Sequence, residues 1–358
     1  MRKIKIVDVS VEKFKALTNY FQDLRNFSVD NAYANGKNGT GKTTKLNALT
    51  YLLNNKKDLS NKLATQADDS NLALVLEIDL GNEVNYQTIS FNKNAWMSIR
   101  NNLAPRKLKV GDYKVLMNEL FNGMWEYFSL LTNPDYFMEL EGSTQRNLFI
   151  NFLLKTQARL GGKNSTEVQE IIDSGKDTTE LKKEIKAEIK QLMQSLENSY
   201  VFDLELKPKI SKELKQATHL IIKQYQIDEA VIKSRIAELD EQLVRIAKAE
   251  NEVVRKFSKG VNDMFANSDL KIKIDLITKT SGEEFMLIKT LDDVEYKNLN
   301  TVKKLEIALA FNKLFQRLSD IETFVLIDNF ERVDNDNSTK LTELLGQRQV
   351  LVAKVTNE

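Results

Sequence analysis

The chain has 358 residues, which is enough to bury a large core and exceeds the usual length of a single domain. Its 52 basic and 51 acidic residues leave a net charge of only +1, so any contact with nucleic acid must come from local basic patches. The absence of cysteine excludes disulfides, thiolate zinc sites and cysteine nucleophiles.

The N-terminal residues predict a cytoplasmic protein with no membrane contact. MRKIKIVDVS lacks the apolar core of a signal peptide. No stretch of the chain approaches the roughly 20 apolar residues of a membrane span.

Two predicted strands and a glycine-rich loop precede the first predicted helix. Residues 4–14 and 27–33 are rich in apolar and β-branched residues, which is typical of strands. The loop GKNGTGKTT follows, and after it Leu46, Leu49, Leu52 and Leu53 recur at helical spacing. Residues 72–80 and 83–91, joined at Gly81 and Asn82, predict a hairpin. Residues 134–154 indicate a turn and then a helix, and residues 161–165 a loop.

Heptad spacing dominates the middle of the chain. Between residues 177 and 198 the spacing is four, three, four for Ile185, Ile189, Leu192 and Leu196. A longer series over 228–257 is interrupted once, by Glu250, and consists of Ile232, Ile236, Leu239, Leu243, Ile246, Val253 and Phe257. We expect a short antiparallel coiled-coil hairpin, of about 45 Å for thirty residues. The alternative is a pair of amphipathic helices packed on a globular core.

The last hundred residues predict a second α/β segment. Strand patterns occur at 270–280, 283–291, 323–329 and 349–355, and an amphipathic helix at 299–318. Because neither half supplies a complete sheet, we expect one composite α/β head. Its predicted parts are an N-terminal lobe (1–175), a coiled-coil insertion (176–260) and a C-terminal lobe (261–358).

The glycine-rich loop matches the phosphate-binding pattern G-x-x-x-x-G-K-[ST]. Its residues, with the one that follows, are Gly36, Lys37, Asn38, Gly39, Thr40, Gly41, Lys42, Thr43 and Thr44. The glycines allow backbone amides to surround the phosphates, Lys42 can reach the outer phosphates, and the Thr43 hydroxyl can bind magnesium at the start of a helix. We expect ATP and Mg²⁺ as ligands, and the alternative is an ordinary glycine turn.

A second motif supplies the other side of this site. The apolar stretch FVLI ends in Asp328, which we expect to hold magnesium through water beside Thr43.

Together these motifs resemble the SMC-like ATPases of the ABC class. The resemblance rests on NGTGKTTKLNALTYLLNNKKD, on the early VEKFKALTN, on the helical insertion and on the late strand that ends in Asp328. This family includes the SbcC-type ATPases. The chain is most similar to its short members, which are often encoded by phages or prophages. The resemblance implies an α/β, P-loop, bilobed ATPase head with an inserted short coiled-coil hairpin. It also implies a homodimer that sandwiches ATP, DNA binding, and a nuclease or recombination protein as partner.

The chain departs from that family at several positions. The family's signature helix corresponds to NLNTVKKLEIALAF, where Asn300 or Thr301 can cap the helix and direct its N-terminus at a phosphate, but the glycines are missing. A plain capped surface helix is the alternative. Only Lys354 or Thr356 stands near the expected switch histidine, Asn133 occupies the approximate place of the family's glutamine, and Lys15 that of a basic residue near the nucleotide. A cysteine-free chain cannot form a zinc hook.

Catalysis depends on the residue that follows Asp328. Asn329 follows Asp328 where hydrolytic relatives carry glutamate, and an amide cannot accept the proton of the attacking water. We expect slow hydrolysis, with Glu331 orienting water and Lys42 stabilising charge; alternatively, Glu331 is a solvated loop residue.

The function expected from the sequence is DNA recombination, repair or phage replication. Arg100, Arg106, Lys107 and Lys109, near Trp96, could contact a phosphate backbone, or could form an ordinary solvated surface. The runner-up function is a nucleotide-gated scaffold with little hydrolysis, for example in phage defence or counter-defence. A third possibility is a P-loop protein whose dimer chemistry has decayed.

Overall fold

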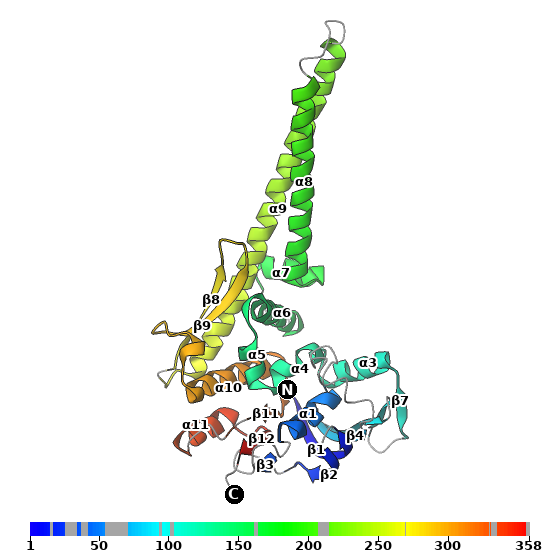
Figure 1. The fold of residues 1–358 in the computed structure, drawn as a ribbon, viewed down its shortest axis with the longest axis vertical. Coiled ribbons are helices and arrows are strands. Elements are labelled where there is room, and N and C mark those ends of the chain that lie inside the picture. Colours follow the sequence, from blue (N-terminus) through cyan, green and yellow to red (C-terminus); the bar gives the residue numbers. More distant parts are fainter. Residues whose placement is uncertain are drawn as a thin grey trace. The chain divides into compact units, whose positions relative to one another are not determined.

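The computed structural model describes residues 1–14, 17–25, 34–36, 42–53, 71–92, 95–100, 104–160, 164–206, 215–268, 270–328, 330 and 335–355. These residues form two compact units (Figure 1). The first combines Met1–Gln145 with Ser258–Glu358, and the second is Arg146–Phe257. The sequence-based boundaries at 175/176 and 260/261 stay predictions.

The larger sheet of the first unit has seven strands within the described residues. Its order is β10-β1-β4-β5-β6-β7, and β2 pairs with β1 as well. β1 runs parallel to β10 and antiparallel to β4, so the sheet is mixed. The strands are β1 (Arg2–Phe14), β2 (Leu17–Asp23), β4 (Asn71–Asp79), β5 (Val84–Asn92), β6 (Ala95–Arg100), β7 (Arg106–Leu108) and β10 (Ile321–Thr323).

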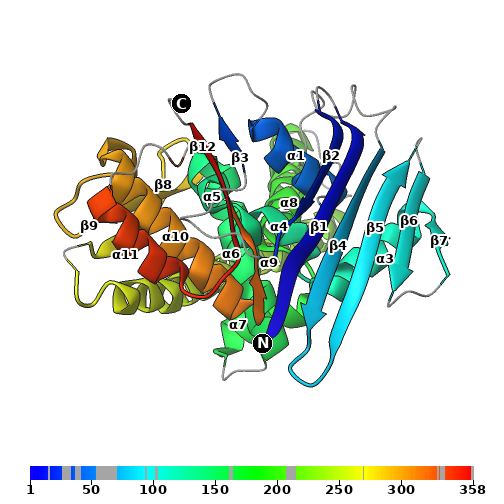
Figure 2. The ribbon, with the colours of Figure 1, turned by 90° about the horizontal axis from the view of Figure 1, so that it is seen from below.

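One face of this sheet belongs to the core. β4 alternates between buried and partly exposed residues, as a strand covered on one face does. Helix α1 (Lys42–Leu53) packs on β1, β4 and β5, and α3 (Val110–Leu120) packs beside β7 (Figure 2). Leu46, Leu49, Leu52 and Leu53 of α1 are all buried. The predicted helix and the predicted β4–β5 hairpin are therefore confirmed, whereas residues 27–33 lie outside the described chain.

A smaller, parallel sheet joins segments from both ends of the sequence. Its order is β11-β12-β3, with β3 (Ala34–Gly36), β11 (Val325–Ile327) and β12 (Val350–Val355). The strand from the N-terminal half thus pairs with β12 from the C-terminal half, as expected of a composite head. A separate hairpin consists of β8 (Ile272–Thr278) and β9 (Glu284–Thr290).

The buried amide of Gln349 connects the two sheets. Its Oε1 accepts a hydrogen bond from the Ile6 amide at 2.8 Å. Its Nε2 donates to the carbonyl oxygens of Ile6 at 2.7 Å and of Leu24 at 2.8 Å. Gln349 immediately precedes β12, and Ile6 lies within β1. The two sheets are therefore connected here by hydrogen bonds from one side chain and not by backbone pairing between strands.

Helix α10 (Thr301–Leu318) crosses the core of the first unit and is fixed by polar side chains. Asn312 Nδ2 donates to the Leu130 carbonyl at 2.8 Å, and Gln316 Nε2 donates to the Leu131 carbonyl at 2.6 Å. These carbonyls belong to the last turn of α4 (Phe128–Thr132). Carbonyl groups in the last turn of a helix have no hydrogen-bond partner within the helix. The remaining helical elements of this unit are η1 (Trp125–Tyr127), α5 (Pro134–Glu139), η4 (Tyr296–Asn298) and α11 (Asn335–Leu345).

Residues 134–139 correct one expectation, because they form helix α5 and not a turn. Asn133 caps this helix by accepting from the amides of Asp135 at 3.0 Å and Tyr136 at 3.3 Å. Pro134 occupies the first helical position, where its missing N–H costs nothing.

The second unit contains the predicted coiled-coil hairpin. Lys182 and Glu188 of α8 (Thr178–Leu206) contact Glu250 and Arg235 of α9 (Lys215–Met264), so the two helices run antiparallel (Figure 1). α9 has 50 residues, about 75 Å at 1.5 Å per residue, and is therefore much longer than expected. Helix α6 (Gly142–Leu160) spans the division between the units, and α7 (Thr166–Ser174) belongs to the second. In the described residues, no helix could cross a bilayer.

Replacing Gln349 by leucine tests the connection between the sheets. Gln349→Leu leaves the amide and carbonyl of Ile6 and the carbonyl of Leu24 without this partner. We expect a loss of roughly 3 kcal/mol in the free energy of unfolding, measured by urea denaturation, because each buried orphan group costs about 1–3 kcal/mol.

Gln347→Leu is the matched control, because Gln347 is exposed two residues earlier. It should change stability by no more than about 0.5 kcal/mol. Equal effects of the two substitutions would show that the amide of Gln349 does not hold the sheets together.

Candidate nucleotide site

The first turn of α1 forms one side of the candidate site. β3 ends at Gly36, which pairs with Val355 in β12, and α1 begins at Lys42. Lys37, Asn38, Gly39, Thr40 and Gly41 lie outside the described residues. The first turn holds Lys42, Thr43, Thr44 and Lys45 and contains no acidic residue. Two lysines at the positive end of a helix are unfavourable by themselves and favour an anionic ligand.

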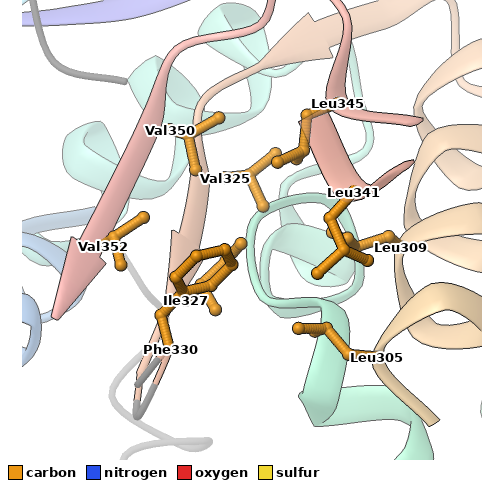
Figure 3. Packing of buried hydrophobic residues seen from close by; sticks show 9 residues of the cluster. All are labelled: Leu305, Leu309, Val325, Ile327, Phe330, Leu341, Leu345, Val350 and Val352. Carbon is orange, nitrogen blue, oxygen red and sulfur yellow. The ribbon is translucent and has the colours of Figure 1, made fainter. Parts of the chain in front are cut away.

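Asp328 reaches the same place from β11. The strand is buried in an apolar cluster between α10, α11 and β12 (Figure 3). The cluster consists of Leu305, Leu309, Val325, Ile327, Phe330, Leu341, Leu345, Val350 and Val352. Because β11, β12 and β3 are parallel, their carboxyl ends share one edge, and Asp328 leaves this edge beside α1.

Thr43 and Asp328 are in direct contact. The Thr43 hydroxyl donates to Asp328 Oδ2 at 2.9 Å, across 285 positions of sequence. A hydroxyl and a carboxylate are hard oxygen ligands of the kind that Mg²⁺ prefers, and the lysine-bearing helix start supplies the charge for phosphates. The described residues contain no group of three His, Cys, Asp or Glu side chains that could hold a metal ion.

Two aromatic side chains hold the opposite end of α1. The Tyr113 hydroxyl donates to the Leu52 carbonyl at 2.6 Å, and Trp125 Nε1 donates to the Leu53 carbonyl at 2.7 Å. The rings meet edge to face, with centroids 5.6 Å apart. Both helix-end carbonyls are thereby satisfied, and the axis of α1 is fixed. The sequence does not predict this anchor, because nothing local to either aromatic residue indicates its partner.

Lys45 packs on Tyr20 of β2. Its Nζ lies 4.6 Å from the centre of the Tyr20 ring, within the range of a cation–π contact. Burial lowers the pKa of Lys45 below its usual value. This contact, also missed from the sequence, ties the first turn of α1 to the edge strand β2.

The predicted signature helix is α10, and Asn300 is its N-cap. Asn300 Oδ1 accepts from the Lys303 amide at 2.9 Å, so Asn300 caps α10 and Thr301 is its first residue. Five residues later, Glu306 is buried, and burial raises its pKa while Lys340 and Lys303 oppose the shift. Whether this helix contacts a second nucleotide stays a prediction.

The other expected site residues divide into placed and undescribed ones. The side-chain oxygen Oδ1 of Asn133 caps α5, so it already has local partners. The Lys354 backbone pairs with Asn35, beside the start of the glycine loop. Lys15, Asn329, Glu331 and Thr356 lie outside the described residues.

The basic cluster lies at the edge of the larger sheet. Arg106 and Lys107 are exposed on the edge strand β7 and pair with Ser98 and Met97 of β6. Arg100 lies 3.9 Å from Glu119 and Arg106 lies 3.8 Å from Asp112, so two of the four cations have acidic neighbours. Lys109 is exposed, and the Trp96 side chain is outside the described residues.

Comparison with known proteins adds a likeness of fold. No family model matches the sequence, and a search of curated proteins finds no match. The recombination mediator protein RecF with ATP, from the RecFOR pathway, matches with a TM-score of 0.51 at 13% identity, over 100% of this chain and 95% of that chain. An Smc head domain of Pyrococcus furiosus, with an extended coiled coil and bound to the C-terminal domain of ScpA, gives a TM-score of 0.48 at 14% identity, over 99% and 90%. An Smc head of Pyrococcus yayanosii gives 0.44 at 15%, over 98% and 92%.

The likeness to RecF confirms the fold expected from the sequence. The chain has a mixed α/β fold similar to that of the RecF structure, with an inserted coiled-coil hairpin. At 13% identity this similarity concerns the fold and not the residues of the site.

Tyr113→Phe tests the anchor of α1. The substitution leaves the Leu52 carbonyl without its donor, and we expect a loss of about 1–3 kcal/mol in unfolding free energy at pH 8. Burial also raises the pKa of Tyr113 above its ordinary 10.0, so the folded state retains a proton that the unfolded state loses. Its stability contribution is complete below pH 10 and declines above it.

The difference in unfolding free energy between wild type and Tyr113→Phe, measured by urea denaturation, should accordingly decrease by about 1.4 kcal/mol between pH 8 and pH 11. The other tyrosines are present in both proteins, so their contributions to the pH dependence of unfolding free energy cancel in the difference. A difference that does not change with pH would contradict the buried, neutral hydroxyl.

Proposed function

We propose that the chain is an MgATP-binding, SMC-like ATPase that dimerises on ATP and acts on DNA in recombination, repair or phage replication. The observation that carries the proposal is the Thr43–Asp328 contact at the start of α1, directly after a phosphate-binding sequence pattern. The similarity of fold to RecF, a recombination mediator whose structure includes ATP, supports it.

The expected residues have separate roles in this proposal. The backbone of Gly36–Gly41 would surround the phosphates, with Lys42 on the outer ones. Thr43 would bind Mg²⁺ directly and Asp328 through water, so ion binding would separate the two side chains. Asn300 would direct α10 at the nucleotide of a second copy. The magnesium ion would neutralise phosphate charge.

The chemistry at Asn329 leaves two variants of the function. With an amide next to Asp328, we propose slow hydrolysis in which Glu331 orients the water. The second candidate, favoured by the same amide, is a nucleotide-gated scaffold in which ATP acts as a switch, for example in phage defence. A nuclease or recombination protein as partner, a phage origin and a cytoplasmic location stay predictions.

Phosphate release with MgATP tests the ATPase, with and without double-stranded DNA. We expect slow turnover that Lys42→Ala abolishes, because the lysine stabilises phosphate charge that develops in the reaction. Glu331→Gln should lower turnover further and prolong an ATP-bound dimer, which size-exclusion chromatography with light scattering would detect.

Tight ATP binding without turnover would favour the scaffold. Turnover that persists in Lys42→Ala would come from a contaminant and would remove the support for an ATPase. No ATP binding by the wild type would contradict both functions.

Charge reversal on β7 tests DNA binding. Arg106→Glu with Lys107→Glu should abolish measurable affinity for double-stranded DNA and reduce its salt dependence, because phosphate contacts release counterions. Fluorescence anisotropy at several salt concentrations measures both quantities.

Lys183→Glu with Lys186→Glu makes the same charge change at exposed positions on α8 and should leave DNA affinity nearly unchanged. Equal losses in both double variants would mean that overall charge, and not the β7 cluster, governs the interaction.

A further inference from the structure

The seam between α8 and α9 contains one charged layer. In α9, positions 232, 236, 239, 243, 246, 250, 253 and 257 follow an unbroken four-three repeat, and Glu250 is the acidic residue within it. In α8, the repeat through Ile185, Ile189, Leu192 and Leu196 extends back by three residues to Lys182. A glutamate and a lysine therefore occupy seam positions where coiled coils normally place apolar residues.

These two residues meet in the second unit, together with an arginine from α6. Lys182 Nζ donates to Glu250 Oε2 at 2.8 Å, and Arg146 Nη2 donates to the same oxygen. Glu250 is 1% exposed, Arg146 4% and Lys182 9%, so all three charged side chains are buried. We call them the buried triad.

The buried triad is a poor way to gain stability. The free energy lost when three charged groups leave water offsets much of the free energy gained from their mutual attraction. Proteins in which apolar residues of similar size replace such a cluster are often equally stable. The best attested use of a buried polar group in a coiled coil is to specify register.

An apolar seam alone would not specify the register here. A shift of α9 by seven residues, about 10.5 Å, restores the four-three repeat. It would place Leu243 or Phe257 where Glu250 lies and would bury Lys182 and Arg146 without that carboxylate. Another ion pair between α8 and α9, Arg235 with Glu188, is substantially exposed and contributes little to the choice of register.

We propose that the buried triad fixes the register of α9 against α8 and excludes pairings displaced by one heptad. This inference concerns the second unit alone and is independent of the proposed nucleotide site.

The absence of cysteine allows the register to be read by cross-linking without background. Glu188→Cys with Arg235→Cys reports the observed register, since these side chains lie 2.9 Å apart across the helices. Glu188→Cys with Asp228→Cys, or with Gln242→Cys, reports pairings displaced by seven residues. All four positions belong to the described chain. A short bis-maleimide reagent is applied to each pair in the full-length protein, and the intramolecular product is quantified on gels.

With the buried triad intact, only the 188/235 pair should cross-link efficiently. The triad is then made apolar with Arg146→Met, Lys182→Leu and Glu250→Leu, a change that preserves packing. Cross-linking of a displaced pair should then rise about tenfold or more, because a buried unpaired charge disfavours displacement by more than that factor. Circular dichroism checks that the helices remain folded.

Glu241→Leu is the matched control, since it removes an exposed carboxylate of α9 that pairs with Arg245. It should leave all cross-linking yields unchanged. The proposal is overturned if the apolar triad variant is helical and still cross-links only the 188/235 pair. It is also overturned if displaced pairs cross-link in the protein with an intact triad. Should the triple variant lose its helical signal, Glu250→Gln replaces it, with the same expected direction and the same overturning result.

Discussion

The hydrogen bonds of Gln349 are the constraint on which the first unit depends most. They join β1 of the larger sheet to the start of β12, the central strand of the smaller sheet. β12 separates β3, which leads to the glycine loop, from β11, which delivers Asp328. A displacement of β12 would therefore move both sides of the candidate site relative to the larger sheet and to α1.

Other buried polar contacts supply orientation in the same way. Arg348 donates to the carbonyls of Leu344 and Leu345 at the end of α11 and to Asn312 Oδ1, and burial lowers its pKa to about 10. Asn312 also holds the end of α4. Apolar packing stabilises this core, but directional bonds at helix and strand ends determine how its elements are aligned.

Local sequence patterns predicted the elements well and their long-range partners poorly. Strand alternation, the glycine loop and helical spacing are local properties, and Asp328 could be placed beside Thr43 because an apolar strand ending in aspartate pairs with the glycine-rich loop at a magnesium-nucleotide site. The partners of Gln349, Tyr113 and Trp125 are distant in sequence and leave no local pattern. Helix α9 is longer than expected because residues 215–227 and 258–264 form helix on either side of the recognised heptads. Helix α5 was missed because its cap and proline also fit a turn.

The pairing of β3 with β12 constrains the order in which the chain can fold. The second unit is continuous in sequence, so its contacts are available before residues 258–358 leave the ribosome. β3, in contrast, pairs with a strand more than 300 residues later, and β1 pairs with β10 over a similar separation. Such non-local closure is slow, because loop entropy is lost before the contacts form. During synthesis, a helical hairpin can thus exist while β3 still lacks the strand with which it pairs.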